Sequence, residues 1–365
     1  STHQTDWAYH PCNNLSQTAA AQLMADLTSR SGLAFALPTD VTLENTTGWK
    51  LQGAGIGKTI LSGGNRHVRC FNLGHADAEL SGFTLSGVTW NRDDSSLDRK
   101  YKGCAIYMTA GTIHDVQVTG ATSSKTYWTS GTALYMTGGS AADCIFDGGR
   151  GAQGECYGIV YQSGGLTERC TFYGNGCSIQ GGALWMSGGT NSWSVFYGNV
   201  AKGKSAQGGA VRMSGGTLMH ATIWGNGAGT DSSANTGAKG GGLYHAGGVV
   251  TNCLVWGNSA PSQSESGKPD WYTTKNDAQA ATLVFNLCTT DAKGVNPIPC
   301  DPQLRDPANG DFSLLASSTC ILEDGTTVGA VAYDRTKPDA AMTVSPRSGF
   351  LTDAVSFAST VRNVA

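Results

Sequence analysis

The chain has 365 residues, of which 51 are glycine and 14% are charged, and its formal net charge is −3. Glycine does not recur at every third position, which excludes collagen, and 39% of the residues are hydrophobic, which excludes charge-driven disorder. The small negative charge gives no electrostatic reason to expect nucleic acid or an anionic membrane as a partner. No apolar run approaches the length needed to span a bilayer.

An N-terminal cap is predicted for residues 1–40. Within it, residues 15–30 carry apolar side chains at helical spacing, which predicts an amphipathic helix. Such a helix commonly covers the open edge of a β-structure, because an exposed edge strand has unpaired backbone groups.

A seven-residue block then recurs through residues 41–290. It contains a small residue, an aliphatic residue, an aromatic residue, Met, Ser or Thr, and two glycines. Copies span residues 133–139, 183–189, 210–216 and 242–248, and degenerate copies span 105–111 and 159–165. Self-similarity at a spacing of about 25 residues is the signature of a repeat architecture.

A second block follows the first in each repeat and ends in an aromatic residue, Gly and Asn. Its copies span 170–175, 194–199, 221–226 and 253–258, with an earlier version at 143–146. Both blocks are too short for helices and alternate with period two, which predicts short strands. We therefore predict an all-β fold, a right-handed parallel β-helix of about nine turns over residues 41–290.

The alternation predicts which side chains face the core. In the first block we expect one column to point inward: Ile106, Leu134, Val160, Leu184, Val211 and Leu243. In the second block the Cys and Phe positions should also point inward. Gly and Asn tolerate the positive φ of a sharp corner. We expect the corner asparagines to stack as a ladder of bonded amides: Asn175, Asn199, Asn226 and Asn258.

The repeat stops near residue 290. Residues 291–337 are rich in Asp, Pro and Gly and are predicted to form an irregular closing extension. Residues 338–365 form a tail with two strand-like runs, 342–344 and 354–357. Because isolated strand pairs are not stable in water, we expect this tail to pack on its own β-helix or on a neighbouring molecule.

The motifs resemble those of a known family. Gly-Gly-Ala-aliphatic at 181–184 and 208–211, together with Phe-x-x-Asn at 172–175 and 196–199, resemble the repeats of polymorphic outer-membrane proteins. That resemblance implies a β-helical passenger domain displayed on a bacterial surface, often adhesive. Residues 301–321 resemble the closing segment of bacterial secreted β-helix proteins. Residues 339–358 resemble the opening strands of a polycystic-kidney-disease-type (PKD) sandwich.

Eleven cysteines and low charge favour a secreted or cell-surface protein. The odd number implies a thiol that is unpaired or shared between chains. Cys144, Cys170 and Cys253 recur at one repeat position and are interpreted as buried thiols. The remaining cysteines are the better disulfide candidates: Cys12, Cys70, Cys104, Cys156, Cys177, Cys288, Cys300 and Cys320.

Two columns of outward aromatic residues are the most suggestive surface feature. The first contains Tyr107, Tyr135, Tyr161, Trp185 and Tyr244, and the second contains Tyr173, Tyr197, Trp224 and Trp256. Such columns could bind sugars or a protein partner. Equally, loops or tails could cover them, or the rings could support the sheet by stacking on one another.

An enzymatic alternative rests on the insertion at residues 91–100. A polysaccharide lyase or glycoside hydrolase needs paired carboxylates, or a base with a neutralising cation. The residues that could provide these groups, or bind Ca²⁺, are Asp93, Asp94, Asp98, Arg99 and Lys100. The simpler interpretation is a solvated, internally neutralised loop, and no other metal site is predicted.

The sequence thus favours a non-catalytic, secreted or cell-surface β-helix with a structural or adhesive role. Its expected partners are further copies of itself, joined into filaments through its ends or tail, other surface proteins, or glycans. The alternatives left open are an enzyme acting on an extracellular glycan and a carbohydrate-binding protein.

Overall fold

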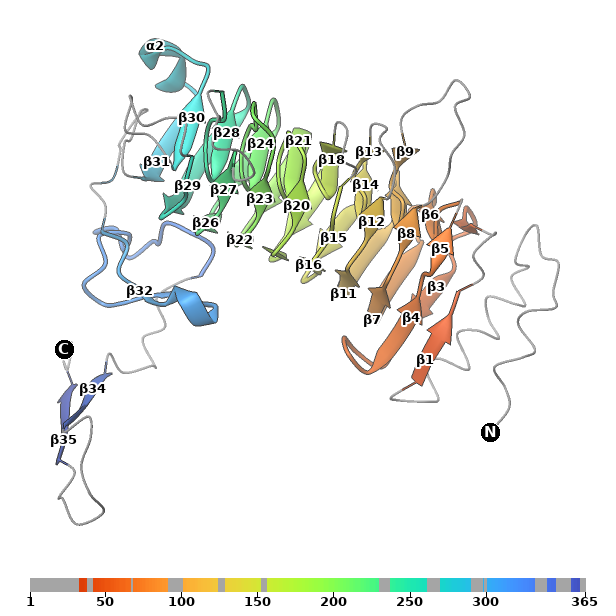
Figure 1. Ribbon diagram of the computed structural model, residues 1–365, viewed down its shortest axis with the longest axis horizontal. Coiled ribbons are helices and arrows are strands. Elements are labelled where there is room, and N and C mark those ends of the chain that lie inside the picture. The colour runs from red at the N-terminus through yellow and green to blue at the C-terminus, as the bar shows by residue number, and fades with distance from the viewer. Residues whose placement is uncertain are drawn as a thin grey trace.

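Parallel strands wound into a solenoid dominate the computed structural model (Figure 1). The structure describes residues 33–37, 42–66, 68–90, 101–123, 129–151, 156–229, 237–260, 270–289, 298, 301–331, 340–345 and 356–361. Within these ranges the only helices are α2 (Asp277–Ala280) and the 3-10 turn η3 (Pro307–Asn309). The expected N-terminal helix at 15–30 lies outside the described residues.

The first column of strands contains the first sequence block. Its members pair parallel and in register, so that Tyr107 faces Tyr135 and Leu184 faces Val211. They are β2 (Leu43–Asn45), β6 (Phe71–Leu73), β10 (Ile106–Met108), β14 (Leu134–Met136), β18 (Val160–Glu168), β21 (Leu184–Ser192), β24 (Val211–Met213), β28 (Leu243–His245) and β30 (Trp271–Thr273).

A second column follows the paired glycines. Its strands are β3 (Lys50–Gln52), β7 (Glu79–Ser86), β11 (Thr112–Thr119), β15 (Ser140–Ala142), the ends of β18 and β21, β25 (Thr217–Met219), β29 (Val249–Trp256) and β31 (Val284–Cys288).

A third column contains the second sequence block. The ends of the long strands β7, β11 and β29 belong to this column, and β1 (Leu33–Ala36) pairs with its first strand, β4 (Thr59–Ser62). The strands that lie wholly within the column are β4, β16 (Ile145–Asp147), β19 (Thr171–Tyr173), β22 (Val195–Tyr197) and β26 (Thr222–Trp224).

Two-residue strands line the remaining corners of each turn. One set is β5 (Asn65–Arg66), β8 (Thr89–Trp90), β12 (Thr122–Ser123), β20 (Gly176–Cys177), β23 (Val200–Ala201) and β27 (Gly227–Ala228). The other is β9 (Tyr101–Lys102), β13 (Thr129–Ser130) and β17 (Cys156–Tyr157), continued by single bridges to Lys239.

These columns make a parallel β-solenoid of about seven turns. The predicted parallel solenoid is therefore confirmed, but about nine turns is too many. Nine strands stack in the first column, whereas the edge that closes each turn pairs at only six levels of the described chain, from Lys102 to Lys239. The first and last strands therefore lie outside fully closed turns.

The core contains the residues predicted to point inward. All members of the aliphatic column from Ile106 to Leu243 are fully buried. Phe146, Phe172 and Phe196 lie inside the third column, and their rings stack from turn to turn. The main stabilisation of such a repeat fold comes from burying apolar side chains of one turn against the equivalent side chains of the next turn.

The second glycine of the pair packs against a methionine of the neighbouring turn, whereas the first packs against a backbone carbonyl, that of Thr109 in the case of Gly138. Gly139 has φ +80°, and a Cβ there would lie 2.5 Å from the terminal methyl of Met108. The same contact joins Gly216 to Met186, so the Met-x-Gly-Gly pattern is a packing rule. In the turn of β28, His245 replaces Met. Its Nε2 donates to the carbonyl of Gly248 (2.9 Å), and its Nδ1 lies 3.0 Å from the Thr273 hydroxyl.

We predict that His245→Met reduces the loss of folding stability between neutral and acidic pH. Burial lowers the pKa of His245 below the value of about 6.5 expected in the unfolded chain. The unfolded state therefore takes up the proton first, and stability falls as the pH drops below about 6.5. Urea midpoints at pH 7.5 and pH 5 should differ less for the variant than for the wild type. An equal difference would contradict this role of His245.

The corner asparagines form a continuous buried ladder. The Asn199 side chain donates to the carbonyl of Phe172 (2.9 Å) and to Oδ1 of Asn226 (3.0 Å). Its Oδ1 accepts from the backbone N–H and the amide of Asn175. Asn226 and Asn258 repeat this arrangement, and Asp270 ends the ladder by accepting from Asn258. Each amide thus satisfies backbone groups that the corner leaves unpaired.

Replacing Asn199 by Ala should destabilise the solenoid by about 2–4 kcal/mol, because several buried partners lose a hydrogen bond at once. Chemical denaturation would measure the difference. Asn72→Ala is the matched control, since that amide bonds to the exposed Glu44 side chain. Equal stability of the two variants would show that the ladder contributes little.

The closing part of the chain folds back on the third column. Its strands β32 (Leu304–Asp306) and β33 (Asp311–Leu314) pair antiparallel, and an apolar cluster joins Leu314 and Val328 to Leu254 of the solenoid. Gly329 N–H donates to Asn252 O (2.9 Å). Further on, β34 (Ala340–Ser345) and β35 (Ser356–Val361) form an antiparallel hairpin, drawn apart from the solenoid in Figure 1.

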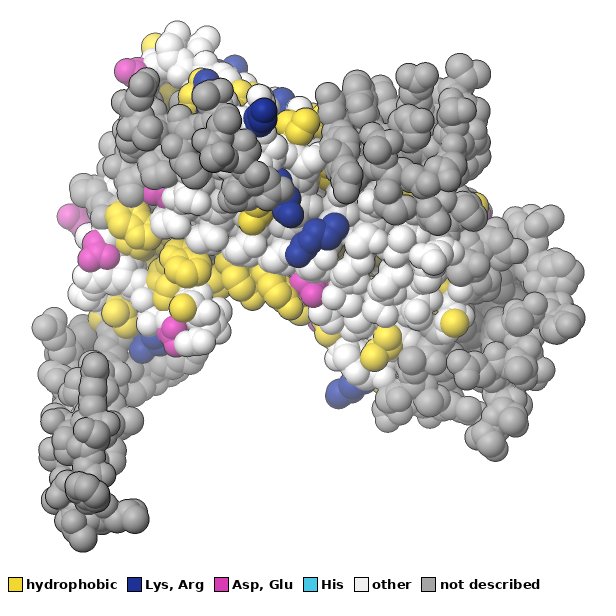
Figure 2. Space-filling view, in the orientation of Figure 1, with side chains coloured by type: hydrophobic (Ala, Val, Ile, Leu, Met, Phe, Trp, Pro, Cys, Tyr) yellow, Lys and Arg dark blue, Asp and Glu magenta, His cyan; other side chains and the backbone are white. Residues whose placement is uncertain are grey.

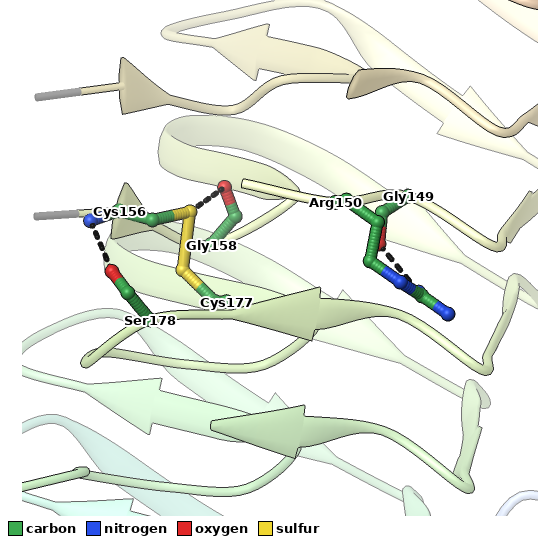
Figure 3. Close-up of a disulfide and its surroundings, with 6 residues drawn as sticks. All are labelled: Gly149, Arg150, Cys156, Gly158, Cys177 and Ser178. Atoms are coloured by element: carbon green, nitrogen blue, oxygen red, sulfur yellow. Dashed lines mark hydrogen bonds between the residues drawn. A yellow bond between two sulfur atoms is a disulfide. The ribbon is translucent and has the colours of Figure 1, made fainter. Parts of the chain in front are cut away.

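One disulfide joins neighbouring turns (Figure 3). It links Cys156 and Cys177, whose Cα atoms lie 5.6 Å apart, and both were disulfide candidates. Cys70, Cys104 and Cys320 were also candidates, but they carry buried thiols, and burial raises the pKa of Cys104 and Cys320 to about 12. Cys288, another candidate, is disulfide-bonded. Cys144, Cys170 and Cys253 are buried thiols, as predicted. Cys12 and Cys300 lie outside the described residues.

Candidate functional site

The first aromatic column is a stack of rings along the solenoid axis. Alternation in each strand points Tyr107, Tyr135, Tyr161 and Trp185 away from the core, and parallel pairing places each ring above the last. The ring centroids of Tyr107 and Tyr135 lie 5.3 Å apart, those of Tyr135 and Tyr161 4.5 Å, and those of Tyr161 and Trp185 4.6 Å.

Cations complete this column. Arg212 occupies the next level and lies 5.2 Å from the Trp185 ring and 5.9 Å from the Tyr244 ring. Tyr244 then stacks on Tyr272, over which lies Lys239. Burial lowers the pKa of the Arg212 guanidinium, and its Nε donates to Gln207. Cation–π contacts thus continue the stack where an aromatic ring is missing.

This packing limits what the first aromatic column can bind. Tyr135 is only 7% exposed, and both of its faces lie against other rings. A sugar stacks on an open ring face, and here the neighbours occupy the faces. The arrangement therefore fits support of the sheet by cross-strand stacking better than ligand binding.

Tyr135→Ala should cost about 2–4 kcal/mol of unfolding free energy, since it opens a gap between two rings. Tyr107→Ala should cost less, because Tyr107 lies at the end of the stack with one ring neighbour, Tyr135, and Arg69. Thermal or urea unfolding of the two variants tests the difference. A larger loss in Tyr107→Ala would contradict the stacking role.

The second aromatic column is partly covered by the closing segment. Tyr173 stacks on Tyr197 at 5.2 Å, and Phe312 contacts both Tyr197 and Trp224. Trp256 packs against the apolar cluster of that segment. Figure 2 shows hydrophobic side chains gathered where the closing segment meets the solenoid. Of this column Tyr173 is the most exposed, at 37%.

A carboxylate lies next to the exposed end of this column. Asp147 precedes Tyr173 in the stack and accepts from the Gln117 amide (2.9 Å) and the Thr119 hydroxyl (2.8 Å). Its charge raises the pKa of the Tyr173 phenol. Asp147 is thus held by neutral donors, which suits a structural network better than a catalytic acid.

A third surface feature was missed from the sequence. At the corner between the second and third columns, seven successive turns place a non-glycine residue at positive φ. This corner ridge consists of Asp115, Asp143, Arg169, Trp193, His220, Asn252 and Asn286. Each directly precedes a buried residue of the third column, such as Cys144, Cys170 or Ser194. The place of these residues, directly before a buried residue, could have been noticed in the sequence. The positive φ that bends the chain there is visible only in the structure.

Contacts run along the corner ridge from turn to turn. Arg169 makes a two-pronged pair with Asp143, at 2.8 and 2.9 Å, and also binds Glu168. The Trp193 and His220 rings stack at 4.0 Å with planes 5° apart. Trp193 is 38% exposed and, with Tyr173, is one of two large hydrophobic residues that are exposed among those described.

The loop that carries the enzymatic alternative, residues 91–100, lies outside the described residues. Asp93, Asp94, Asp98, Arg99 and Lys100 lie outside the described residues, as does any Ca²⁺ site built from them. In the part of the chain that the structure describes, no group of three or more His, Cys, Asp or Glu side chains could hold a metal ion. No helix in that part is long and apolar enough to cross a membrane.

No protein family matches the sequence of this chain. No curated protein and no solved structure shows significant similarity to it. The resemblance to polymorphic outer-membrane proteins therefore rests on the repeated motifs alone, and the fold stands as a parallel β-solenoid.

Proposed function

We propose that this protein is a non-catalytic, secreted or cell-surface rod with a structural or adhesive role. The observation that carries the proposal is the axial stacking of the first aromatic column, in which the ring faces contact one another instead of forming an open cleft. A stack of this kind stiffens the solenoid along its length.

Two further features support a rigid rod. The asparagine ladder joins successive turns through buried amides, and the corner ridge joins them on the outside through ion pairs and stacked rings. Each turn is thus tied to the next at several points around its perimeter. Stability of a solenoid depends on these contacts between neighbours.

The proposed location rests on chemistry and motifs. The disulfide between Cys156 and Cys177 hints at an oxidising, extracellular-type environment. The Gly-Gly-Ala-aliphatic and Phe-x-x-Asn motifs resemble surface-displayed β-helices, which supports a bacterial surface or secreted protein.

Self-association through the tail is part of the proposal. The hairpin of β34 and β35 has two strands, and a lone two-stranded hairpin is marginally stable in water. Packing against a second copy would stabilise it. Repeated head-to-tail contacts of this kind produce filaments when they do not close into a ring.

Negative-stain electron microscopy in non-reducing buffer tests this proposal. We expect filaments or a defined oligomer of rods for the full chain, and single rods after removal of residues 338–365. An unchanged assembly state after that removal would overturn the role of the tail. Release of reducing ends or unsaturated sugars from a panel of extracellular polysaccharides would overturn the non-catalytic assignment.

A further inference from the structure

We propose that Trp193 is the floor of a carbohydrate-binding site on the corner ridge, which takes a neutral pyranose ring of an oligosaccharide. This inference goes beyond the proposed function and is independent of it, because a rod could assemble without binding any sugar. It would give the rod a ligand class for adhesion.

Among the described residues, the Trp193 indole has one stacking partner, on one of its two faces. That face is covered by the His220 ring at 4.0 Å, and Trp193 nevertheless stays 38% exposed. The preceding level of the ridge holds Arg169, which could have covered the other face. Instead Arg169 binds Asp143, one turn further away, through Nε and Nη2, and binds Glu168 through Nη1. Neither a cation nor another ring covers that face among the described residues.

The His220 ring that stacks on the indole is itself in contact with neighbouring side chains. His220 Nε2 lies 3.3 Å from the Asn252 amide, and Asn252 accepts from the Asn286 amide at 2.7 Å. Burial lowers the pKa of His220, which favours the neutral form of the supporting imidazole. A flat ring fixed by a stacked neighbour and a row of amides is a preorganised platform, which reduces the entropy lost on binding.

The backbone at this position also points to function. Trp193 has φ +54°, although a bulky residue is a rare outlier there. Asp or Asn, which tolerate this conformation, occupy the corner at 115, 143, 252 and 286. A Trp at such a position is strained, and retained strain suggests that the exposed ring has a use.

Polar groups that suit hydroxyls lie on the two preceding levels of the ridge. A guanidinium has five N–H donors, and three nitrogens of Arg169 already hold Asp143 and Glu168, which leaves two N–H groups. The side chains of Arg169 and Asp143 are 49% and 44% exposed. The carboxylate oxygens of Asp143 and Glu168 keep lone pairs that can accept further hydrogen bonds. These groups offer paired donors and acceptors beside an apolar face.

The same features disfavour other ligands. The single positive charge of Arg169 is paired with two carboxylates, so an anionic ligand finds no unpaired cation at this pair. A pyranose presents C–H groups on one face and hydroxyls around its edge, which matches an indole face with a polar border. The first aromatic column lacks this match because its ring faces are covered.

The test is binding of the full chain to an array of neutral tetrasaccharides of glucose, galactose, mannose and N-acetylglucosamine. Titration calorimetry with the strongest of them follows. Trp193→Asn should fold normally, because Asn occupies the same corner at 252 and 286, yet it should weaken binding more than about tenfold. Trp193→Phe should retain part of the affinity, since it keeps a ring face.

Tyr107→Ala is the matched control, because it removes an outward ring from the first aromatic column and leaves the ridge intact. It should bind as the wild type does. The proposal is overturned if no tetrasaccharide binds the wild type at millimolar concentration, or if binding survives Trp193→Asn. It is also overturned if that variant changes only the oligomeric state, which would make the ridge a contact between copies of the chain.

Discussion

In-register pairing between neighbouring turns is the constraint on which this structure depends. No turn can bury its own apolar face, so every residue finds its partner at the same position one turn away. Identical chemistry therefore accumulates in columns: aliphatic side chains and Phe inside, Asn at a corner, aromatic rings outside. Each column satisfies a different need, namely hydrophobic burial, pairing of corner backbone groups, and stacking of exposed rings.

Departures from a column are compensated locally. Gln162 and His245 replace Met in the buried column, and each finds backbone or side-chain partners inside the turn. Arg212 replaces an aromatic ring and continues the stack as a cation. A buried polar group without partners would be costly, so these substitutions are accompanied by their hydrogen bonds. Trp193 differs, because it occupies a corner at positive φ and, although it stacks on His220, it stays 38% exposed.

The two aromatic columns have the same pattern in the sequence, but their rings have different neighbours in the structure. In the first, the rings stack on one another and Arg212 fills a gap. The second is covered at its far end by Phe312, a residue more than a hundred positions along the chain from Tyr197. Sequence spacing predicts which residues share a column. It does not predict which segment returns to cover them, because that contact is long-range.

The sequence by itself determined the repeat, the strands, the parallel solenoid and its inward columns, because period-two alternation and Gly-Asn corners are local and recur every turn. It also identified the four asparagines that hydrogen-bond in one column. Only the tertiary structure decided the number of turns, the pairing of Cys156 with Cys177, and the corner ridge. Those depend on backbone angles and on contacts between distant segments. The exposure of Trp193 is of this second kind as well, because alternation along the sequence does not show how much of the ring its neighbours cover.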